Sequence, residues 1–259
     1  MAKYALKKSD KEGIVYPMTL ENRNILVVGG ATGIGRAAAI LCAQRGANVV
    51  IADSNAVDGN ATAKDSSGFF IELEVTNESK VIEMCEVIAR KYIGLDGLVQ
   101  AAGILRGAYD SIEDFSVDMF RQVLEVNTVG SFLCAKYATP LLKRGSRPVI
   151  VLVSSVAAHG GSSSYAYGTS KGGVSALGIT MEGKLAAEGI RVNVVCPGGI
   201  NTSMKLSVIA EDARRTGQDP EAAMNIASLT LGNPAGVAKL IAFLLSDEAD
   251  YVRGSIATR

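Results

Sequence analysis

Three polar residues in the second half of the chain have the types and spacing of a proton-transfer site. Tyr167 and Lys171 are four residues apart, and Ser155 lies twelve residues before Tyr167. On a helix, residues four apart share a face, with Cβ atoms about 5–6 Å apart. A free tyrosine has a pKa of about 10, and a nearby ammonium lowers that value because it favours the phenolate. The pattern therefore predicts that Lys171 lowers the pKa of Tyr167, which acts as a general acid/base.

A glycine-rich turn near the start of the chain is typical of a site for nucleotide phosphates. Gly29, Gly33 and Gly35 follow the apolar stretch Asn24–Gly29 and open a stretch with helical character. Glycine tolerates the φ angles of a tight turn and lets the backbone approach a pyrophosphate. The start of the helix adds free N–H groups and a partial positive charge. We predict a dinucleotide site here, with an ordinary strand–helix turn as the alternative.

Asp53 ends the second apolar stretch and indicates which dinucleotide is bound. An acidic side chain at this place accepts hydrogen bonds from the adenosine ribose hydroxyls and repels a 2′-phosphate. Neither Thr32 in the glycine turn nor Ser54 after the aspartate is basic, and Arg36 is interpreted as a surface or packing side chain. NAD is therefore predicted in preference to NADP. A solvated turn residue is the alternative role for Asp53.

The composition favours a protein that acts on small molecules. The 259 residues include 26 basic and 26 acidic side chains, so the net charge gives no reason to expect nucleic acid or an anionic membrane as partner. The four cysteines lie far apart and His159 is the single histidine, so no metal site is predicted. The N-terminus has no apolar signal segment, and no apolar run reaches the roughly eighteen residues of a membrane span. We expect a reduced, cytoplasmic protein.

Strand-like and helix-like stretches alternate along the chain, which predicts one doubly wound α/β domain. Its parallel seven-stranded sheet carries helices on both faces. Residues 1–22 are interpreted as a polar extension, 23–259 as the catalytic domain and about 203–231 as a lid over the substrate. Strands are expected at residues 24–29, 48–52, 69–73, 97–101, 148–153, 191–196 and about 251–255. Helices are expected at residues 33–45, 78–92, 116–143, 167–188 and 234–245, with no clean periodicity between 202 and 231.

Taken together, these stretches resemble the short-chain dehydrogenase/reductase family across residues 20–256. The matching segments are, in order, GGATGIG (29–35), Asp53, AAG (101–103), Asn127, SSV (154–156), the Tyr167/Lys171 pair and PGGINT (197–202). The resemblance implies a Rossmann fold and an NAD-dependent oxidoreductase that interconverts a secondary alcohol and a ketone. The hydride passes directly between the substrate carbon and the nicotinamide.

The resemblance implies a role for each matching residue. Tyr167 exchanges a proton with the substrate oxygen, Ser155 hydrogen-bonds that oxygen, and Lys171 also holds the nicotinamide ribose. Asn127 is expected to kink its helix and to position a water beside Lys171. Besides Tyr167 and Lys171, the residues expected to contact the cofactor are Gly29, Thr32, Gly33, Ile34, Gly35, Asp53, Glu74, Val75, Ala101, Ala102, Gly103, Pro197, Gly198, Ile200 and Thr202.

Four glycines on the helix of Tyr167 predict close approach of another backbone. Glycine in a helix costs about 1 kcal/mol relative to alanine, and here the positions are Gly172, Gly173, Gly178 and Gly183. The family commonly forms tetramers through this helix and the 116–143 helix. A homotetramer, or a homodimer, is therefore expected.

The chain departs from the family pattern at a few positions. Val28 replaces a threonine, Glu74 replaces an aspartate near the adenine, and Gln100 and Ala101 replace two asparagines. The family continues into a tail beyond the last strand, whereas this sequence stops at Arg259, so either a tail is missing or a subunit contact is reduced.

Other functions remain open at this stage. An NADPH-dependent ketoreductase is disfavoured by Asp53, and a non-catalytic nucleotide-sensing protein of the same fold would have lost part of the catalytic set, which is complete here. Longer extended relatives with epimerase or dehydratase activity space their glycines differently. His159 is a candidate to line the substrate pocket, and Arg214 and Arg215 are expected to face solvent. The apolar lid residues favour a carbocyclic, aliphatic or aromatic alcohol, or else pack against the core: Met204, Leu206, Val208, Ile209, Met224, Ile226 and Leu229.

Overall fold

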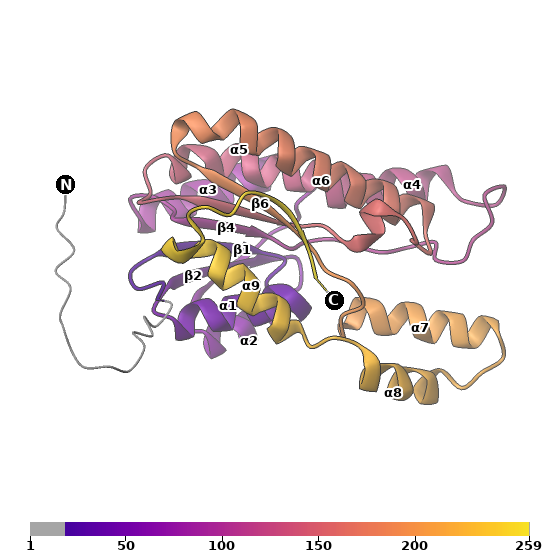
Figure 1. Cartoon of the computed structure of the whole chain (residues 1–259). Helices are drawn as coiled ribbons and strands as arrows, with labels where there is room; N and C mark the ends of the chain where they lie inside the picture. Colours follow the sequence, from indigo (N-terminus) through magenta and orange to yellow (C-terminus); the bar gives the residue numbers. More distant parts are fainter. Residues whose placement is uncertain (1–18, 259) are drawn as a thin grey trace, which may run out of the picture.

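Seven strands form one sheet at the centre of the molecule, in the order β3-β2-β1-β4-β5-β6-β7 (Figure 1). In the computed structural model, which describes residues 19–258, every neighbouring pair of strands is parallel. The predicted doubly wound fold with seven parallel strands is confirmed. The strands are β1 (Asn24–Val28), β2 (Asn48–Asp53), β3 (Phe69–Glu72), β4 (Gly97–Gln100), β5 (Val149–Val153), β6 (Arg191–Cys196) and β7 (Gly254–Ala257).

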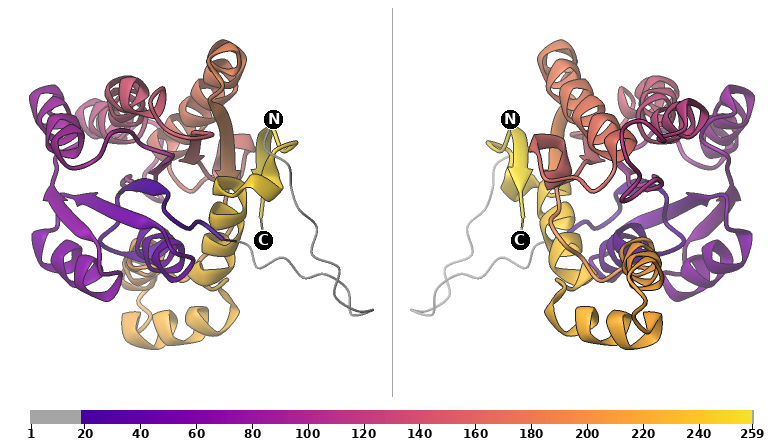
Figure 2. Two further views of the ribbon diagram at one scale, coloured as in Figure 1. Left: turned by 90° about the vertical axis from the view of Figure 1, so that its left-hand side faces the viewer. Right: turned by 90° about the vertical axis from the view of Figure 1, so that its right-hand side faces the viewer.

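Helices cover both faces of the sheet (Figures 1 and 2). Neighbouring strand residues alternate between the two cores: Leu26 belongs to one hydrophobic cluster and Val27 to the other. This alternation follows from the period of two in a strand. The helices are α1 (Gly33–Gln44), α2 (Ala56–Asp65), α3 (Glu78–Lys91), α4 (Val117–Leu124), α5 (Gly130–Leu142), α6 (Tyr165–Leu185), α7 (Ser203–Arg215), α8 (Pro220–Thr230) and α9 (Pro234–Leu245).

Several predicted boundaries are confirmed. Strand β6 and helix α9 begin and end at the predicted residues. Helix α1 ends before Gly46, whose φ of +92° is the left-handed conformation expected of a helix-ending glycine. The Ser116 hydroxyl accepts a hydrogen bond from the Met119 N–H at 3.3 Å and caps α4 as predicted.

Other boundaries differ from the prediction. The expected 116–143 helix is divided into α4 and α5 by a π-helical turn at Glu125–Val129. Helix α6 begins at Tyr165 instead of residue 167, because Ser164 caps it. The last strand is β7 at Gly254–Ala257, later than the expected 251–255.

Helix α2 was not predicted. Asn55 caps it by accepting a hydrogen bond from the Asp58 N–H at 3.1 Å, and Gly59 lies against the Phe70 ring, where a Cβ would be 2.1 Å from a ring carbon. The helix carries few apolar residues, so its formation depends on this local cap and this close packing on β3 more than on amphipathic periodicity.

Residues 202–231, where the sequence shows no clean periodicity, contain α7 and α8, which lie side by side beyond the main body (Figures 1 and 2). The Thr202 hydroxyl caps α7 through the Lys205 N–H at 3.3 Å. Asp219 caps α8, and Pro220 occupies its first turn. Caps at both helices explain order that the periodicity did not reveal.

The residues just before β1 pack against the domain. Leu20 is fully buried, and its N–H donates to the Arg45 carbonyl at 2.8 Å. Residues 1–18 of the expected extension, and Arg259, lie outside the described residues. Among residues 19–258, no helix has the length and apolar character needed to cross a membrane.

Candidate active site

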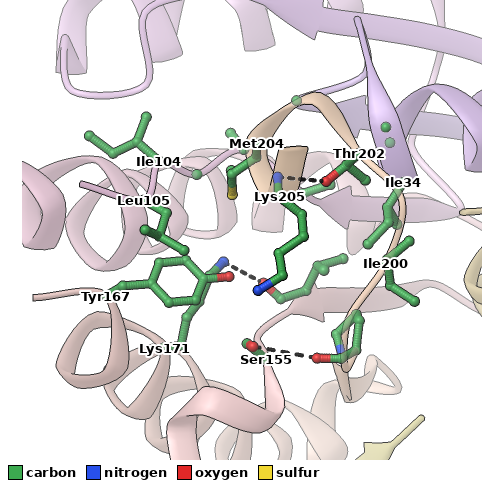
Figure 3. A pocket seen from close by; sticks show the side chains of 18 of the residues that line it. Ile34, Ile104, Leu105, Ser155, Tyr167, Lys171, Ile200, Thr202, Met204 and Lys205 are labelled. Atoms are coloured by element: carbon green, nitrogen blue, oxygen red, sulfur yellow. Dashed lines mark hydrogen bonds between the residues drawn. The ribbon is translucent and has the colours of Figure 1, made fainter. Parts of the chain in front are cut away.

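A cavity of about 520 Å³ opens where the strand order reverses between β1 and β4, at the carboxyl edge of the sheet (Figure 3). Ligands of open α/β sheets bind at this kind of crevice. Ser155, Tyr167, Lys171 and all the residues expected to contact the cofactor line it. Among the residues predicted for catalysis or cofactor binding, Asn127 alone does not line it.

The glycine turn forms a cradle that side chains would fill. A Cβ at Gly29, whose φ is +77°, would lie 2.3 Å from the Ala102 N atom, and one at Gly35 would lie 2.0 Å from the Gly29 carbonyl oxygen. The Thr32 side chain makes no capping hydrogen bond to α1. The first N–H groups of the helix are therefore left for a ligand, and the turn fits a bound pyrophosphate.

Asp53 both lines the cavity and holds the glycine turn. Its carboxylate accepts hydrogen bonds from the Ala31 N–H at 3.0 Å and from the Asn55 N–H at 2.9 Å. Arg36 pairs with Asp65 at 2.6 Å on the surface, as its interpretation as a surface side chain predicts. The cavity thus has an acidic group at the end of β2, and the lining residues Thr32 and Ser54 are not basic.

The two serines after β5 point in different directions. The Ser155 hydroxyl lies near the Pro197 carbonyl, at 3.4 Å, and accepts from the Ala157 N–H at 3.2 Å. The Ser154 hydroxyl turns towards α6 and donates to the Lys171 carbonyl at 2.8 Å. Alternation along an extended chain explains the difference, and it leaves the Ser155 hydroxyl for a substrate.

Tyr167 and Lys171 line the cavity, and burial shifts the pKa of each. Burial lowers the pKa of Lys171 to about 8, and its Nζ donates to the Val153 carbonyl at 2.9 Å. Burial also raises the pKa of Tyr167, and a hydrogen bond with Ser155 opposes that rise. The predicted direction for Tyr167 is therefore wrong for this structure, because burial outweighs the hydrogen bond with Ser155. The Lys171 Nζ lies 5.7 Å from the centroid of the Tyr167 ring.

Asn127 lies in the π-helical turn and connects two parts of the site. Its Oδ1 accepts from the Ile104 N–H at 2.7 Å, and its Nδ2 donates to the Ser170 hydroxyl at 2.9 Å. A Cβ at Gly103 would lie 3.1 Å from Asn127 Oδ1 and 3.2 Å from Lys171 Nζ. The side chain is fully buried and acts on the cavity through these neighbours. The expected disturbance of the helix is present as the π turn.

His159 does not line the cavity, contrary to the expectation. It is exposed in the turn after Ser155, with Nε2 4.0 Å from the Cys196 Sγ. Tyr165, the competing tyrosine, is also exposed and packs edge-on against Phe115. Within residues 19–258, no group of three or more His, Cys, Asp or Glu side chains is placed to hold a metal ion.

The glycines of α6 serve different surfaces. A Cβ at Gly178 would lie 2.2 Å from Val194 Cγ2, and one at Gly173 would lie 3.0 Å from Thr128 Cγ2. These two positions are explained by packing within the chain. At Gly183 no described atom comes within 4 Å of the Cβ position, and at Gly172 the nearest is 3.9 Å away.

Sequence reasoning missed several lining residues that no motif marks. They are Ile104, Leu105, Arg106, Gln122 and Lys205. Three of them directly follow the AAG segment, and Lys205 lies on the first turn of α7, shortly after Thr202. Their proximity to matched segments was the available signal.

Comparisons with known proteins identify the family. A family model described as enoyl-(acyl carrier protein) reductase matches residues 29–258. The 3-oxoacyl-(acyl-carrier-protein) reductase of Thermotoga maritima is 34% identical over 92% of this chain and 96% of its own. The cis-4-hydroxycyclohexanecarboxylate dehydrogenase of Sinomonas cyclohexanicum is 36% identical over 90% of this chain and 93% of its own. The chain belongs to the short-chain dehydrogenase/reductase family and is an oxidoreductase of that family.

Solved structures agree with this assignment. Levodione reductase superimposes with a TM-score of 0.82 at 25% identity, over 92% of this chain and 95% of its own. The Pseudomonas aeruginosa RhlG/NADP active-site complex gives a TM-score of 0.81 at 28% identity, over 93% and 96% of the two chains. Members of this family use a nicotinamide cofactor, and the glycine cradle fits one.

Proposed function

We propose that the protein is an NAD-dependent oxidoreductase that interconverts a secondary alcohol and a ketone. The observation that supports this best is the convergence of Tyr167, Ser155 and Lys171 in one cavity that also contains the glycine cradle and Asp53. A sensing protein of the same fold would not need this complete set.

Each side chain has a role that its position permits. Burial favours the neutral phenol of Tyr167, which donates its proton to a carbonyl oxygen in reduction and becomes a phenolate. In oxidation the phenolate takes the proton from the substrate hydroxyl and becomes the phenol again. The Ser155 hydroxyl donates a hydrogen bond to the same oxygen as negative charge develops there. Lys171 lies beneath them and holds the cofactor ribose, while Asn127 positions the loop after β4. When bound, the nicotinamide supplies or accepts the hydride.

Asp53 supports NAD as the preferred cofactor. The carboxylate would repel a 2′-phosphate, and Arg36 on the first turn of α1 is paired with Asp65. NADP is the second candidate, because the similar RhlG structure is described as an NADP complex. Fluorescence titration with NADH and NADPH separates them: the proposal expects at least about tenfold tighter NADH binding, and equal or tighter NADPH binding would overturn it. Asp53 also holds the glycine turn, so the unaltered protein gives the cleanest ratio.

The substrate end of the cavity supports a cyclic or aliphatic alcohol. Ile104, Leu105 and Met204 give it an apolar lining. One relative is named for a hydroxycyclohexanecarboxylate, a cyclic alcohol. A panel of cyclohexanol, a hydroxycyclohexanecarboxylate, its methyl ester and aromatic secondary alcohols, each with NAD, samples these shapes.

The reaction is tested by Tyr167→Phe, with Tyr165→Phe as the matched control on the same helix. We expect Tyr167→Phe to lower turnover by about a hundredfold or more, since proton transfer is lost, with NADH binding retained. Tyr165→Phe should keep its activity, because that side chain lies outside the cavity. Undiminished turnover in Tyr167→Phe would remove the assigned acid/base. NADH binding without turnover in the unaltered protein, across the panel, would favour the sensing function.

We further propose a cytoplasmic homotetramer or homodimer, with α7 and α8 as a lid over the substrate. The open glycines Gly172 and Gly183, together with the exposed side chains of Ile179 and Phe132, support an oligomer face on α6 and α5. Analytical ultracentrifugation of the whole chain tests this; a monomer at micromolar concentration would contradict it.

A further inference from the structure

The charged side chains that line the cavity are separated by sign. Asp53 ends β2 and Glu74 follows β3, on one side of β1. Arg106 follows β4, Lys171 lies on α6 after β5, and Lys205 lies on α7 after β6, all on the other side. The cavity therefore has an acidic adenosine end and a basic end, and the basic end contains the proposed proton donor.

Two of these cations have no counter-charge. The ammonium of Lys171 donates to the Val153 carbonyl. In contrast, no side-chain hydrogen bond or ion pair joins Lys205 or Arg106 to any group in residues 19–258. Lys205 is half-buried, and Figure 3 shows its side chain directed into the cavity. A partly desolvated ammonium without an anion is unfavourable, so a ligand that brings an anion would be stabilised there.

The backbones that carry these cations are fixed to the catalytic elements. The Lys205 N–H donates to the Thr202 hydroxyl at 3.3 Å, which sets the first turn of α7. The Arg106 carbonyl accepts from the Ser164 hydroxyl at 2.6 Å, and the same hydroxyl accepts from the Tyr167 N–H at 3.2 Å. The backbone at both positions is thus fixed relative to the proton donor, while the Lys205 side chain extends into the cavity and the Arg106 side chain is exposed at its rim.

We propose that Lys205, assisted by Arg106 at the rim, binds a carboxylate of the substrate, so that the substrates are hydroxy acids and the matching oxo acids. This inference rests on the proposed function and names its substrate class. The lining also includes the apolar side chains of Ile104, Leu105 and Met204. It therefore fits a hydrocarbon frame with the carboxylate at one end and the reacting hydroxyl at the other.

The cofactor pyrophosphate is the competing anion for Lys205. Thr202 lies against the glycine turn, with its Cγ2 3.1 Å from the Cβ position of Gly33, so the start of α7 is near the phosphates. However, the first turn of α1 already offers its N–H groups to that charge, and Arg106 belongs to the loop after β4. The experiment must therefore measure cofactor and substrate binding separately.

The test compares a hydroxycyclohexanecarboxylate with its methyl ester at saturating NAD. Lys205→Met should raise KM for the acid by about tenfold or more, because a charged hydrogen bond is lost, while KM for the ester and the Kd of NADH change less than about twofold. Arg106→Gln should shift KM in the same direction by a smaller factor, and Lys205→Arg should retain most of the acid preference. Arg214→Gln is the matched control, an exposed cation on the same helix but outside the cavity.

Four results would overturn the inference. Equal changes for acid and ester would assign Lys205 no role in carboxylate recognition, and weaker NADH binding in Lys205→Met would assign it to the cofactor phosphates. An unaltered protein that prefers the ester would contradict it directly. Calorimetric titration of the NADH complex with cyclohexanecarboxylate measures binding at the anion site without turnover. Binding that is lost in Lys205→Met supports the inference even if none of the alcohols in the panel is oxidised. Absence of binding to the complex of the unaltered protein overturns it. Failure of turnover alone would count against the proposed function instead.

Discussion

Gly178 and Gly183 lie on the same helix, α6, in opposite surroundings. A Cβ at Gly178 would lie 2.2 Å from Val194 Cγ2 on β6 and 3.3 Å from Leu152 Cδ1 on β5. At Gly183, no described atom lies within 4 Å of the Cβ position. We predict that Gly178→Ala destabilises the protein and that Gly183→Ala, its matched control, stabilises it.

The magnitudes follow from packing and helix propensity. Carbon atoms in contact are about 3.5–4.0 Å apart, so α6 and β6 must separate by roughly 1 Å or more to admit the Gly178→Ala methyl group. Overpacking of this kind costs about 1–3 kcal/mol, and the gain in helix propensity returns about 0.5–1 kcal/mol. The net loss is therefore up to about 2.5 kcal/mol. Gly183→Ala gains helix propensity without overpacking, so it should stabilise the protein. For a chain of this size, each kcal/mol of stability shifts Tm by roughly 2–4 °C.

Thermal unfolding followed by circular dichroism measures both variants. Tm should fall for Gly178→Ala and rise for Gly183→Ala. NAD-linked turnover should also fall for Gly178→Ala, because the displaced helix carries Tyr167 and Lys171. Val194→Ala in the Gly178→Ala background should recover part of the lost activity, since it removes the methyl group that clashes.

The reasoning is refuted if Gly178→Ala raises Tm as Gly183→Ala is expected to. A fall in Tm for Gly183→Ala alone has a different meaning: the outer face of α6 would be covered by a second subunit. Sedimentation of that variant then distinguishes a weakened oligomer from a destabilised subunit.

Two further predictions concern buried titratable groups. Because the pKa of Lys171 falls from 10.5 to about 8 on folding, the unfolded chain binds more protons between these values, and stability contributed by this group rises with pH across that window. Urea unfolding at pH 7, 8.5 and 10 measures the free energy of unfolding of the unaltered protein and of Lys171→Met. The unaltered protein should gain stability relative to Lys171→Met as the pH rises, by at most about 3 kcal/mol. A difference in free energy that stays constant with pH would contradict the effect of burial on Lys171. Burial raises the pKa of Cys42, Cys85 and Cys134 to about 12, so these thiols should react with iodoacetamide only after unfolding, and rapid labelling of the folded chain, located by mass spectrometry, would show that the cores open.

The strands could be predicted because buried parallel strands need only a continuous apolar run. The stretch Asn24–Val28 has such a run, and its predicted end differs from the observed one by one residue. Arg191–Cys196 is mainly apolar, with Asn193 within it, and its boundaries were predicted correctly. Helix α2 was missed because its order depends on Gly59 against Phe70, a contact that sequence spacing does not contain. Helix α8 buries none of its residues fully, so it lacks the apolar stripe that reveals a surface helix.

Most of the cavity could be predicted because its residues belong to short segments with fixed places on the fold. Arg106 and Lys205 could not, since one lies in the loop after β4 and the other on the first turn of α7, and nothing in the two sequences relates them. The direction of the pKa shift of Tyr167 was wrong for a related reason. Spacing on a helix shows which groups are near each other, but the burial that dominates this pKa depends on what the rest of the chain places around the helix.

One buried hydroxyl connects the chemistry of the site with its recognition of charge. Ser164 caps α6 by accepting from the Tyr167 N–H, and it donates to the Arg106 carbonyl. A cap of this kind contributes about 1 kcal/mol to helix stability, but here it also fixes the loop after β4 to the first turn of the catalytic helix. A movement of that loop would therefore disturb the tyrosine backbone. For this reason, the distance between a substrate's anionic group and its reacting oxygen should be limited to a narrow range by the fold itself.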